Sequence, residues 1–363
     1  MPWSEILNHR SAFERFQKSV ANNRLASTYL FVGKDGVGKH LFALKLAQAL
    51  LCENSPEPLA PCGTCPSCAQ VNAQTHPDLI LVSKPADKAF IPLELFIGKP
   101  EHRRQTGLCH EIGLKPFRGG RKIAIINDAD FLNVEGANSL LKTLEEPPAN
   151  SLLILIGSSE QKQISTIVSR SQTVRFGDLT EEEVTSILGS MTDLETTTPL
   201  PHLAAASGGS VARAVELADD ETFQFRQSFL SAMASIDPGK DAFAGEVLGF
   251  VDAAGKDTAK KRDRLVMVGD FAIEFLRGLI GAALGTNNDQ PEAMTNHLNS
   301  AINLMQTRKG MSGQQIAEAA GYSIERTIQL QSDVRTNATP ANIIAPWFRD
   351  VARALHGEPL MVG

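Results

Sequence analysis

The sequence predicts an α/β protein whose first 177 residues form a doubly wound parallel sheet, followed by domains made of helices. Short apolar runs rich in β-branched residues alternate with helical patterns up to residue 176. A glycine-rich loop joins the first of these runs to the first long helical pattern, and after Thr180 the pattern is almost wholly helical. A strand, a loop and a helix in that order are the context in which a phosphate loop forms.

The predicted strands are short apolar runs, as expected for the buried strands of a parallel sheet. We expect them at residues 28–33, 78–83, 121–127, 151–157 and 172–176. Helices are expected at residues 39–51, 106–114 and 133–146. The last of these ends before Pro147 and Pro148, because proline lacks a backbone N–H and disfavours helical geometry in the residue before it.

The loop at residues 33–39 has the spacing of a phosphate loop but lacks the hydroxyl that should follow it. Gly33, Gly36 and Gly38 allow backbone N–H groups to turn toward phosphate, and Lys39 is placed for the outer phosphates. The next position should be Ser or Thr, which binds Mg²⁺, but it is His40. Mg²⁺ prefers oxygen ligands, so an imidazole suits it poorly. The loop is therefore expected to form and ATP hydrolysis to be impaired.

The end of the strand at 121–127 also lacks a residue that helps to bind Mg²⁺ in phosphate-loop enzymes. Phosphate-loop enzymes place a metal-orienting Asp at this tip, whereas this chain has Asn127 followed by Asp128. Asn is neutral and offers one carbonyl oxygen to a metal ion. Both changes weaken the binding of the same ion, Mg²⁺. Together they predict a nucleotide fold that no longer hydrolyses nucleotide, with weak or absent binding of ATP and ADP. A working ATPase with unusual ligands is the alternative.

Composition and charge exclude several classes of protein. A length of 363 residues suggests two or three domains, and 42% hydrophobic with 21% charged residues is typical of soluble globular proteins. The longest apolar stretch, 265–285, is interrupted by Asp270, Glu274 and Arg277, and the N-terminus has no signal-peptide pattern, so we expect a cytoplasmic protein without a membrane span. A net charge of −6 argues against a protein that by itself binds a long stretch of nucleic acid.

Four of the five cysteines lie close together in the sequence. Cys52, Cys62, Cys65 and Cys68 have the spacing C-x₉-C-x₂-C-x₂-C, which in a reducing compartment favours a structural Zn²⁺ site with four thiolate ligands. Such a site has no open position for water or substrate. Free or redox-active thiols are the alternative. Cys109 stands alone and is interpreted as an ordinary, partly buried thiol.

Thr180 and Glu183 form a predicted capping box that starts a new helical unit. We therefore expect three domains. The first spans residues 1–177 and contains the cysteine module at 52–68, the second is a small helical domain at 178–225, and the third is a larger helical domain at 226–363.

Several motifs together closely resemble those of the bacterial DNA polymerase III clamp-loader subunits, which belong to the AAA+ superfamily. The most specific is the run NSLLKTLEEPP at 138–148, followed by Ser169-Arg170-Ser171. The others are the loop at 33–39, the cysteine module, residues 76–78, Gly208-Gly209-Ser210 with Arg213, and residues 337–340. The resemblance implies an AAA+ sheet domain, a helical lid domain and a C-terminal helical collar.

Within this family one member is the ATP-hydrolysing motor and another is a rigid stator whose own nucleotide site has decayed. With His40 and Asn127, this chain resembles the stator. The resemblance implies that Arg170 reaches into the ATP site of a neighbouring motor subunit as an arginine finger. It also implies a ring with the motor (gamma/tau) and delta subunits that loads the sliding clamp on primed DNA. The family has Ser-Arg-Cys where this chain has Ser169-Arg170-Ser171, and the guanidinium that does the chemistry is retained.

Simpler interpretations stay open for several residues. Arg170 could be a surface arginine, Arg213 could sense phosphate or hold the lid through a salt bridge, and Asp128 could be a weak acid or a loop cap. His76 is interpreted as structural, and Glu145 with Glu146 as helix-end and subunit-contact residues. For the whole chain the alternatives are an active AAA+ motor ATPase and a nucleotide-binding scaffold outside replication.

Overall fold

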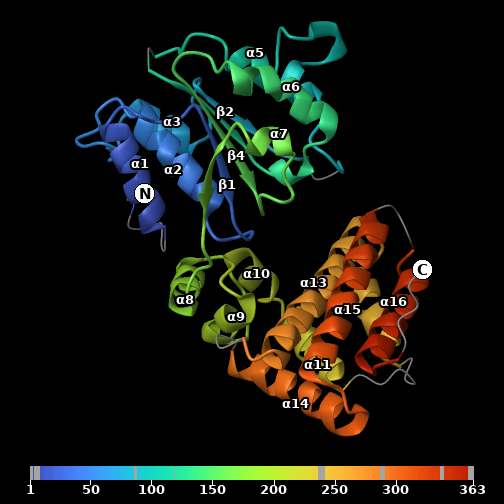
Figure 1. The fold of residues 1–363 in the computed structure, drawn as a ribbon. Helices are drawn as coiled ribbons and strands as arrows, with labels where there is room; N and C mark the ends of the chain where they lie inside the picture. Colours follow the sequence, from blue (N-terminus) through green and yellow to red (C-terminus); the bar gives the residue numbers. More distant parts are fainter. Residues whose placement is uncertain are drawn as a thin grey trace. The chain divides into compact units, whose positions relative to one another are not determined.

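The computed structural model describes residue 3 and residues 9–85, 88–118, 120–235, 242–286, 291–335 and 339–358. The chain forms two compact units, Met1–Glu216 and Leu217–Gly363 (Figure 1). Each unit is described by itself. The predicted domain borders after residues 177 and 225 stay predictions.

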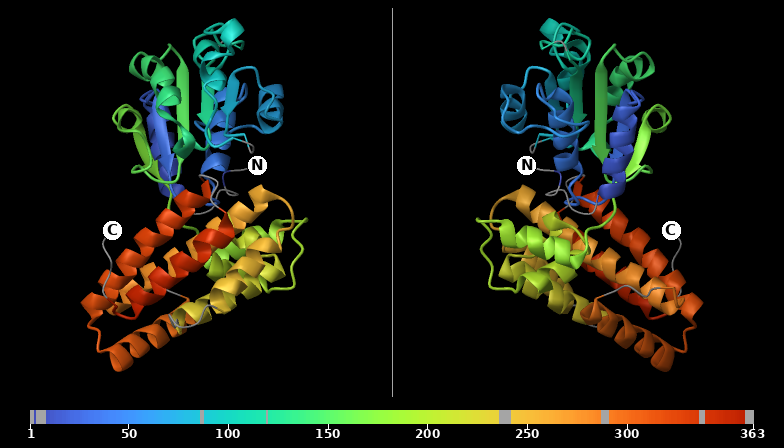
Figure 2. Two further views of the ribbon diagram at one scale, coloured as in Figure 1. Left: turned by 90° about the vertical axis from the view of Figure 1, so that its right-hand side faces the viewer. Right: turned by 90° about the vertical axis from the view of Figure 1, so that its left-hand side faces the viewer.

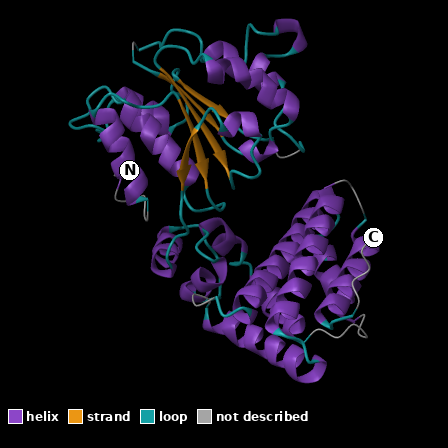
Figure 3. Cartoon of the chain, viewed as in Figure 1, coloured by secondary structure: helices purple, strands orange, loops and turns teal. Residues whose placement is uncertain are grey.

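The N-terminal unit contains the predicted parallel sheet, so this part of the fold prediction is confirmed (Figure 3). Its five strands are β1 (Thr28–Val32), β2 (Leu79–Val82), β3 (Lys122–Ile126), β4 (Ser151–Gly157) and β5 (Gln172–Arg175). All pairings are parallel, and the order across the sheet is β2-β3-β4-β1-β5. Every residue of β1, β3 and β4 is buried, as expected for strands covered on both faces.

Helices cover both faces of this sheet. One apolar cluster joins the sheet to α1 (Arg10–Ala21), α2 (Lys39–Leu51) and α3 (Pro66–Asn72). A second cluster joins the opposite face to α4 (Glu94–Ile97), α5 (Leu108–Glu111), α6 (Val134–Glu145) and α7 (Ser165–Val168). Two short 3₁₀ turns, η2 (Pro100–His102) and η3 (Ala129–Phe131), complete the domain. The first cluster holds α2 against the sheet, and α2 begins where the glycine-rich loop ends.

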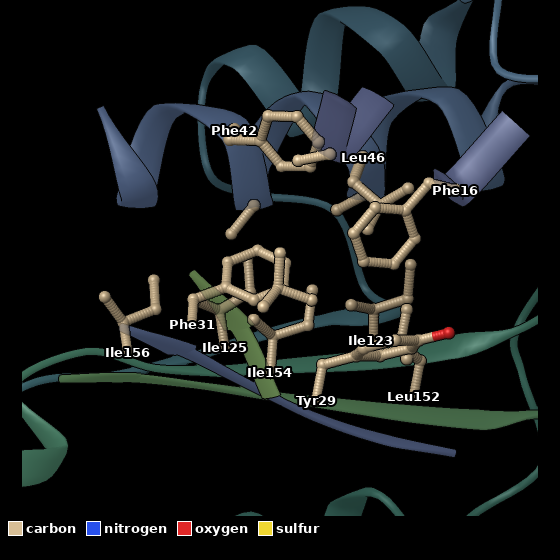
Figure 4. Packing of buried hydrophobic residues seen from close by; sticks show 14 of the residues in the cluster. Phe16, Tyr29, Phe31, Phe42, Leu46, Ile123, Ile125, Leu152, Ile154 and Ile156 are labelled. Carbon is tan, nitrogen blue, oxygen red and sulfur yellow. The ribbon is translucent and has the colours of Figure 1, made fainter. Parts of the chain in front are cut away.

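The first cluster is rich in aromatic rings, and alternation along β1 explains it. Tyr29 and Phe31 project to the side of α1 and α2, where Figure 4 shows them under Phe16 and Phe42. The ring centroids of Phe31 and Phe42 lie 5.9 Å apart, and those of Phe16 and Tyr29 4.8 Å apart, both within the range of favourable aromatic pairs. Leu30 projects to the opposite cluster. This packing fixes the height and angle of α2 over the sheet.

One predicted helix is wrong in length. The pattern at 106–114 predicts two helical turns, but α5 is a single turn at Leu108–Glu111. Gly107 precedes it with φ 89, a left-handed conformation outside a helix, and a Cβ there would lie 2.8 Å from the Phe96 carbonyl oxygen. Beyond the helix the chain turns at Gly113, whose amide bonds to the His110 carbonyl. The glycines therefore make the helix shorter than its apolar spacing predicts.

Three short helices complete the N-terminal unit: α8 (Glu181–Ser190), α9 (Leu200–Ser207) and α10 (Val211–Glu216). The predicted capping box is confirmed. The Glu183 amide donates to the Thr180 hydroxyl at 3.2 Å, and the Thr180 amide donates to the Glu183 carboxylate at 2.8 Å. α9 ends at Gly208, which takes the left-handed conformation usual after a helix.

The described part of the C-terminal unit is helical throughout (Figure 2). Its helices are α11 (Asp220–Ala234), α12 (Ala242–Asp252), α13 (Thr258–Ala283), α14 (Glu292–Lys309), α15 (Gly313–Arg335) and α16 (Pro340–Leu355). α13 and α15 pack closely because Gly269 leaves room for Gln331, whose amide donates to the Val266 carbonyl at 3.0 Å. No helix within the described ranges is long and apolar enough to cross a membrane. Asn337 and Ala338 of the family motif lie outside the described residues.

Candidate functional site

The glycine-rich loop connects β1 to α2, as predicted for a phosphate loop. Gly36 and Gly38 have φ values of 75 and 97, which residues with a Cβ rarely adopt. Gly38 also forms the N-cap of α2. A Cβ at Gly36 would clash with the backbone of Ala212, so glycine is required there for packing as well as for conformation.

Lys39 is buried, and its ammonium is held by the loop itself. Its Nζ donates to the carbonyls of Gly33 and Lys34 at 2.6 Å each and lies 3.5 Å from the Asp35 carboxylate. Burial lowers the pKa of the Lys39 ammonium, and the nearby charge of Asp35 opposes that shift. A phosphate group would have to replace these bonds to engage Lys39.

The structure brings the loop and the end of β3 together around one cavity of about 710 Å³. Residues from the predicted nucleotide site line it, namely Gly36, Gly38, Lys39, His40, Asn127 and Asp128. Gly33 lies outside this lining, next to a smaller hollow beside Phe176. The cavity thus brings together His40 and Asn127, which the sequence analysis identifies separately.

His40 supplies an imidazole, not a hydroxyl, to the lining of this cavity. Its Nδ1 is buried and has no hydrogen-bond partner in the described part of the chain. Burial lowers the pKa of the imidazole, and the negative charge of Asp128 opposes that shift. The Asp128 carboxylate in turn accepts a hydrogen bond at 3.2 Å from the Lys84 amide, which supports its interpretation as a loop cap.

Asp130 is a cavity residue that the sequence reasoning missed. Its two carboxylate oxygens each accept from the Ser158 amide at 3.0 Å, and the carboxylate also accepts from the Gln163 side chain. These bonds join the end of β3 to the end of β4. A Cβ at Gly157 would lie 2.6 Å from the Asp130 Oδ1, so this close approach requires glycine. An Asp shortly after the apolar strand at 121–127 was the only sequence signal.

We predict that Asp130→Ala lowers the free energy of unfolding by about 1–3 kcal/mol, because the Ser158 amide and the Gln163 side chain lose their acceptor. Urea unfolding of the purified variant measures the change. Asp130→Asn keeps one acceptor oxygen and should lose less. Equal stability of Asp130→Ala and the parent chain would contradict this role.

The segment after α9 contacts the loop directly. The Ser210 hydroxyl donates to the Asp35 carbonyl at 2.6 Å, and the Val211 amide donates to the Gly36 carbonyl at 3.2 Å. Arg213 is mostly buried on the same short helix, with its guanidinium 3.9 Å from the Glu216 carboxylate. Arg213 is not among the residues that line the cavity.

The four predicted zinc ligands converge in space. The sulfurs of Cys52, Cys62, Cys65 and Cys68 all lie within 4.8 Å of one another, with Cys52–Cys65 and Cys62–Cys68 separations of 4.0 Å. Thiolates 2.3 Å from a tetrahedral Zn²⁺ would be about 3.8 Å apart. The donor set and its spacing therefore fit a tetrahedral metal ion with no position left over.

Backbone amides donate to three of these sulfurs, whereas burial raises the pKa of the Cys52 and Cys68 thiols. The amides of Cys62, Cys65 and Cys68 donate to the sulfurs of Cys52, Cys62 and Cys65 at 3.3, 3.3 and 3.4 Å. A bond from the Thr64 amide is the main cause that lowers the pKa of Cys62 to about 6. Behind the cluster His76 is buried, contacting the Ser67 hydroxyl at 3.1 Å and accepting from the Asp78 amide at 3.0 Å. This supports a structural role for His76.

Arg170 lies on the surface after α7, with a third of its side chain exposed. Its Nε and Nη2 both donate to Oε1 of Glu145, at 3.1 and 2.7 Å. Its Nη1 donates to the Thr166 carbonyl at 3.2 Å and the Ser169 hydroxyl at 3.1 Å. The guanidinium is therefore fixed against the end of α6.

Comparison with known proteins finds a match to a family model in the N-terminal part of the chain. The family model described as DNA polymerase III, delta subunit, matches residues 8–180, slightly less than half of the chain. The subunit delta prime of DNA polymerase III from Bacillus subtilis is 38% identical over 130 residues, and that from Pseudomonas aeruginosa is 36% identical over 123 residues. The subunit tau from Salmonella typhimurium is 30% identical over 147 residues.

These matches concern a limited part of each protein. The match to the Bacillus relative spans 36% of this chain and 35% of that relative. The match to the Pseudomonas relative spans 34% of each protein. The match to the Salmonella relative spans 40% of this chain and 21% of that relative. The predicted resemblance to the clamp-loader subunits is confirmed, and the delta prime relatives support the delta prime type. The delta subunit family match covers the glycine-rich loop, the cysteine cluster and Arg170.

Proposed function

We propose that this chain is a non-hydrolysing clamp-loader subunit that gives Arg170 to the ATP site of an adjacent motor subunit of tau/gamma type. The observation that carries the proposal is the cavity where His40 and Asn127 meet. A buried imidazole nitrogen and a neutral amide replace the hydroxyl and the carboxylate that would hold Mg²⁺. Arg170 lies on the surface of the same domain, where a neighbour can reach it.

The proposed assembly follows from the relatives. Delta prime and tau subunits both resemble part of this chain, which is expected if related subunits assemble side by side. We infer a hetero-oligomeric ring with motor and delta subunits, in which the C-terminal helices form the collar. In that ring ATP binding and hydrolysis by the motor drive loading of the sliding clamp on primed DNA, at the replisome in the cytoplasm.

Two cofactor proposals accompany this function. The cysteine cluster holds one structural Zn²⁺, which ties the loop at 53–61 to the ends of α2 and α3. ATP or ADP binds weakly or not at all, because Lys39 is engaged by loop carbonyls and the positions for Mg²⁺ are altered.

We predict that the purified chain does not hydrolyse ATP and that Lys39→Ala changes nothing in a steady-state phosphate-release assay. The proposed site lacks the hydroxyl and the carboxylate that would hold Mg²⁺. Removal of the Lys39 ammonium therefore removes no catalysis. The retained loop and cavity favour one other candidate, an active motor ATPase. Turnover that disappears in Lys39→Ala would support that candidate and reject the stator.

Co-purification with a tau/gamma-type motor subunit tests the assembly. A stable complex is expected whether or not ATP is present. A chain that stays separate from the motor under all nucleotide conditions would favour a scaffold outside replication.

A further inference from the structure

Two motifs that are separate in the sequence meet in the structure. The run NSLLKTLEEPP ends α6, and Ser169-Arg170-Ser171 follows α7. α6 and α7 are neighbours in the fold (Figure 1). Leu140 and Leu144 of α6 lie with Ile167 of α7 in the second apolar cluster. This packing places Glu145, the last residue of α6, beside the Arg170 guanidinium.

Contacts within the chain use most of the hydrogen-bonding capacity of Arg170. A guanidinium has five N–H donors in one plane. Four of them are used within the chain, two on Glu145 and one each on Thr166 and Ser169. One Nη2 donor is left for a partner. Bonds from all three nitrogens fix the rotation of the guanidinium as well as its position.

From this geometry we infer that Glu145 is a positioning residue for the arginine finger, holding the Arg170 guanidinium in the orientation that meets the neighbour's phosphates. The inference rests on the proposed function. A free arginine side chain loses considerable rotamer freedom when it is placed for reaction, and a side chain that is already fixed avoids that loss. Catalytic electrostatics gain most from groups arranged in advance.

The two bonds from Arg170 converge on a single oxygen, Oε1 of Glu145. One carbonyl oxygen has two lone pairs and can accept both. The orienting role therefore needs an acceptor at this point and does not need the negative charge. Glu145→Gln retains such an oxygen, and Glu145→Ala removes it.

The test uses the complex reconstituted with its motor subunit, with hydrolysis measured against ATP concentration. Glu145→Ala should lower kcat on the order of tenfold, with KM and assembly unchanged, because a misplaced group loses transition-state contacts. Glu145→Gln should restore most of the rate. The matched control is Glu160→Ala, because Glu160 pairs with Arg175 at 2.7 Å, an arginine with no part in the proposed finger, and its loss should leave kcat unchanged.

A double variant separates this inference from the proposed function. If Glu145 acts through Arg170, then Glu145→Ala has no further effect in an Arg170→Ala background. An inert Arg170→Ala would reject the finger itself. An effective Arg170→Ala with an inert Glu145→Ala would reject only the positioning role. Faster hydrolysis in both Glu145 variants would show that the carboxylate restrains the arginine by its charge, and would also overturn the inference.

Discussion

Replacing Arg170 with alanine is expected to lower hydrolysis at the neighbouring ATP site by about 10³-fold or more. The guanidinium stabilises the charge that spreads over the transferring phosphoryl group, and no other donor takes its place when it is removed. Single-turnover hydrolysis by the reconstituted complex measures this step, while size-exclusion chromatography checks that the complex still forms. Arg170→Lys keeps a positive charge but loses the planar fork, so its rate should stay close to that of Arg170→Ala.

Arg175 offers a matched control for this experiment. It lies on β5, is three quarters exposed and pairs with Glu160 at 2.7 Å, outside the nucleotide cavity. Arg175→Ala should leave hydrolysis unchanged. If Arg170→Ala and Arg175→Ala turn over ATP at the same rate as the parent complex, Arg170 is only a surface residue.

The second large effect is expected from the cysteine cluster. Metal analysis of the purified chain should find about one zinc per chain, and Cys65→Ser should remove most of it. Cys65 is buried, supplies one proposed thiolate, and its sulfur also caps α3 by accepting from the Cys68 amide. Losing both roles should lower the free energy of unfolding by about 4 kcal/mol or more.

Cys109→Ser is the control for this substitution. Cys109 is partly buried on α5, and its thiol donates to the Ser139 carbonyl at 3.5 Å, so a serine hydroxyl can make the same bond. Its zinc content should equal that of the parent chain. Undiminished zinc in Cys65→Ser would remove Cys65 from the ligand set.

The sequence predicts well those features that depend on neighbours in the chain. Buried strands and the capping box at Thr180 are local patterns, and the close spacing of the four cysteines in the sequence favours convergence of their sulfurs, which the structure shows. Helix α5 shows the limit of periodicity, because Gly107 and Gly113 set its length. A glycine's conformation depends on the backbone that packs against it, which no apolar pattern reports.

Contacts between segments that are distant in the chain could not be predicted from the sequence. Asp130 bonds to Ser158 across two strand ends, and Glu145 bonds to Arg170 across two helices. Each residue alone resembles an ordinary surface carboxylate. Only the crossover connections of the sheet bring the pairs together, so their roles follow from the tertiary structure.

The position of β1 within the sheet has a consequence for synthesis on the ribosome. Thr28 pairs with Leu153 and Tyr29 pairs with Gln172, so the first strand made has no partner until the fourth and fifth strands have emerged. Until then its apolar side chains and unpaired backbone groups are exposed to aggregation, and such long-range pairing is slow. The nascent domain should therefore depend on chaperones until the segment around residue 175 has left the exit tunnel.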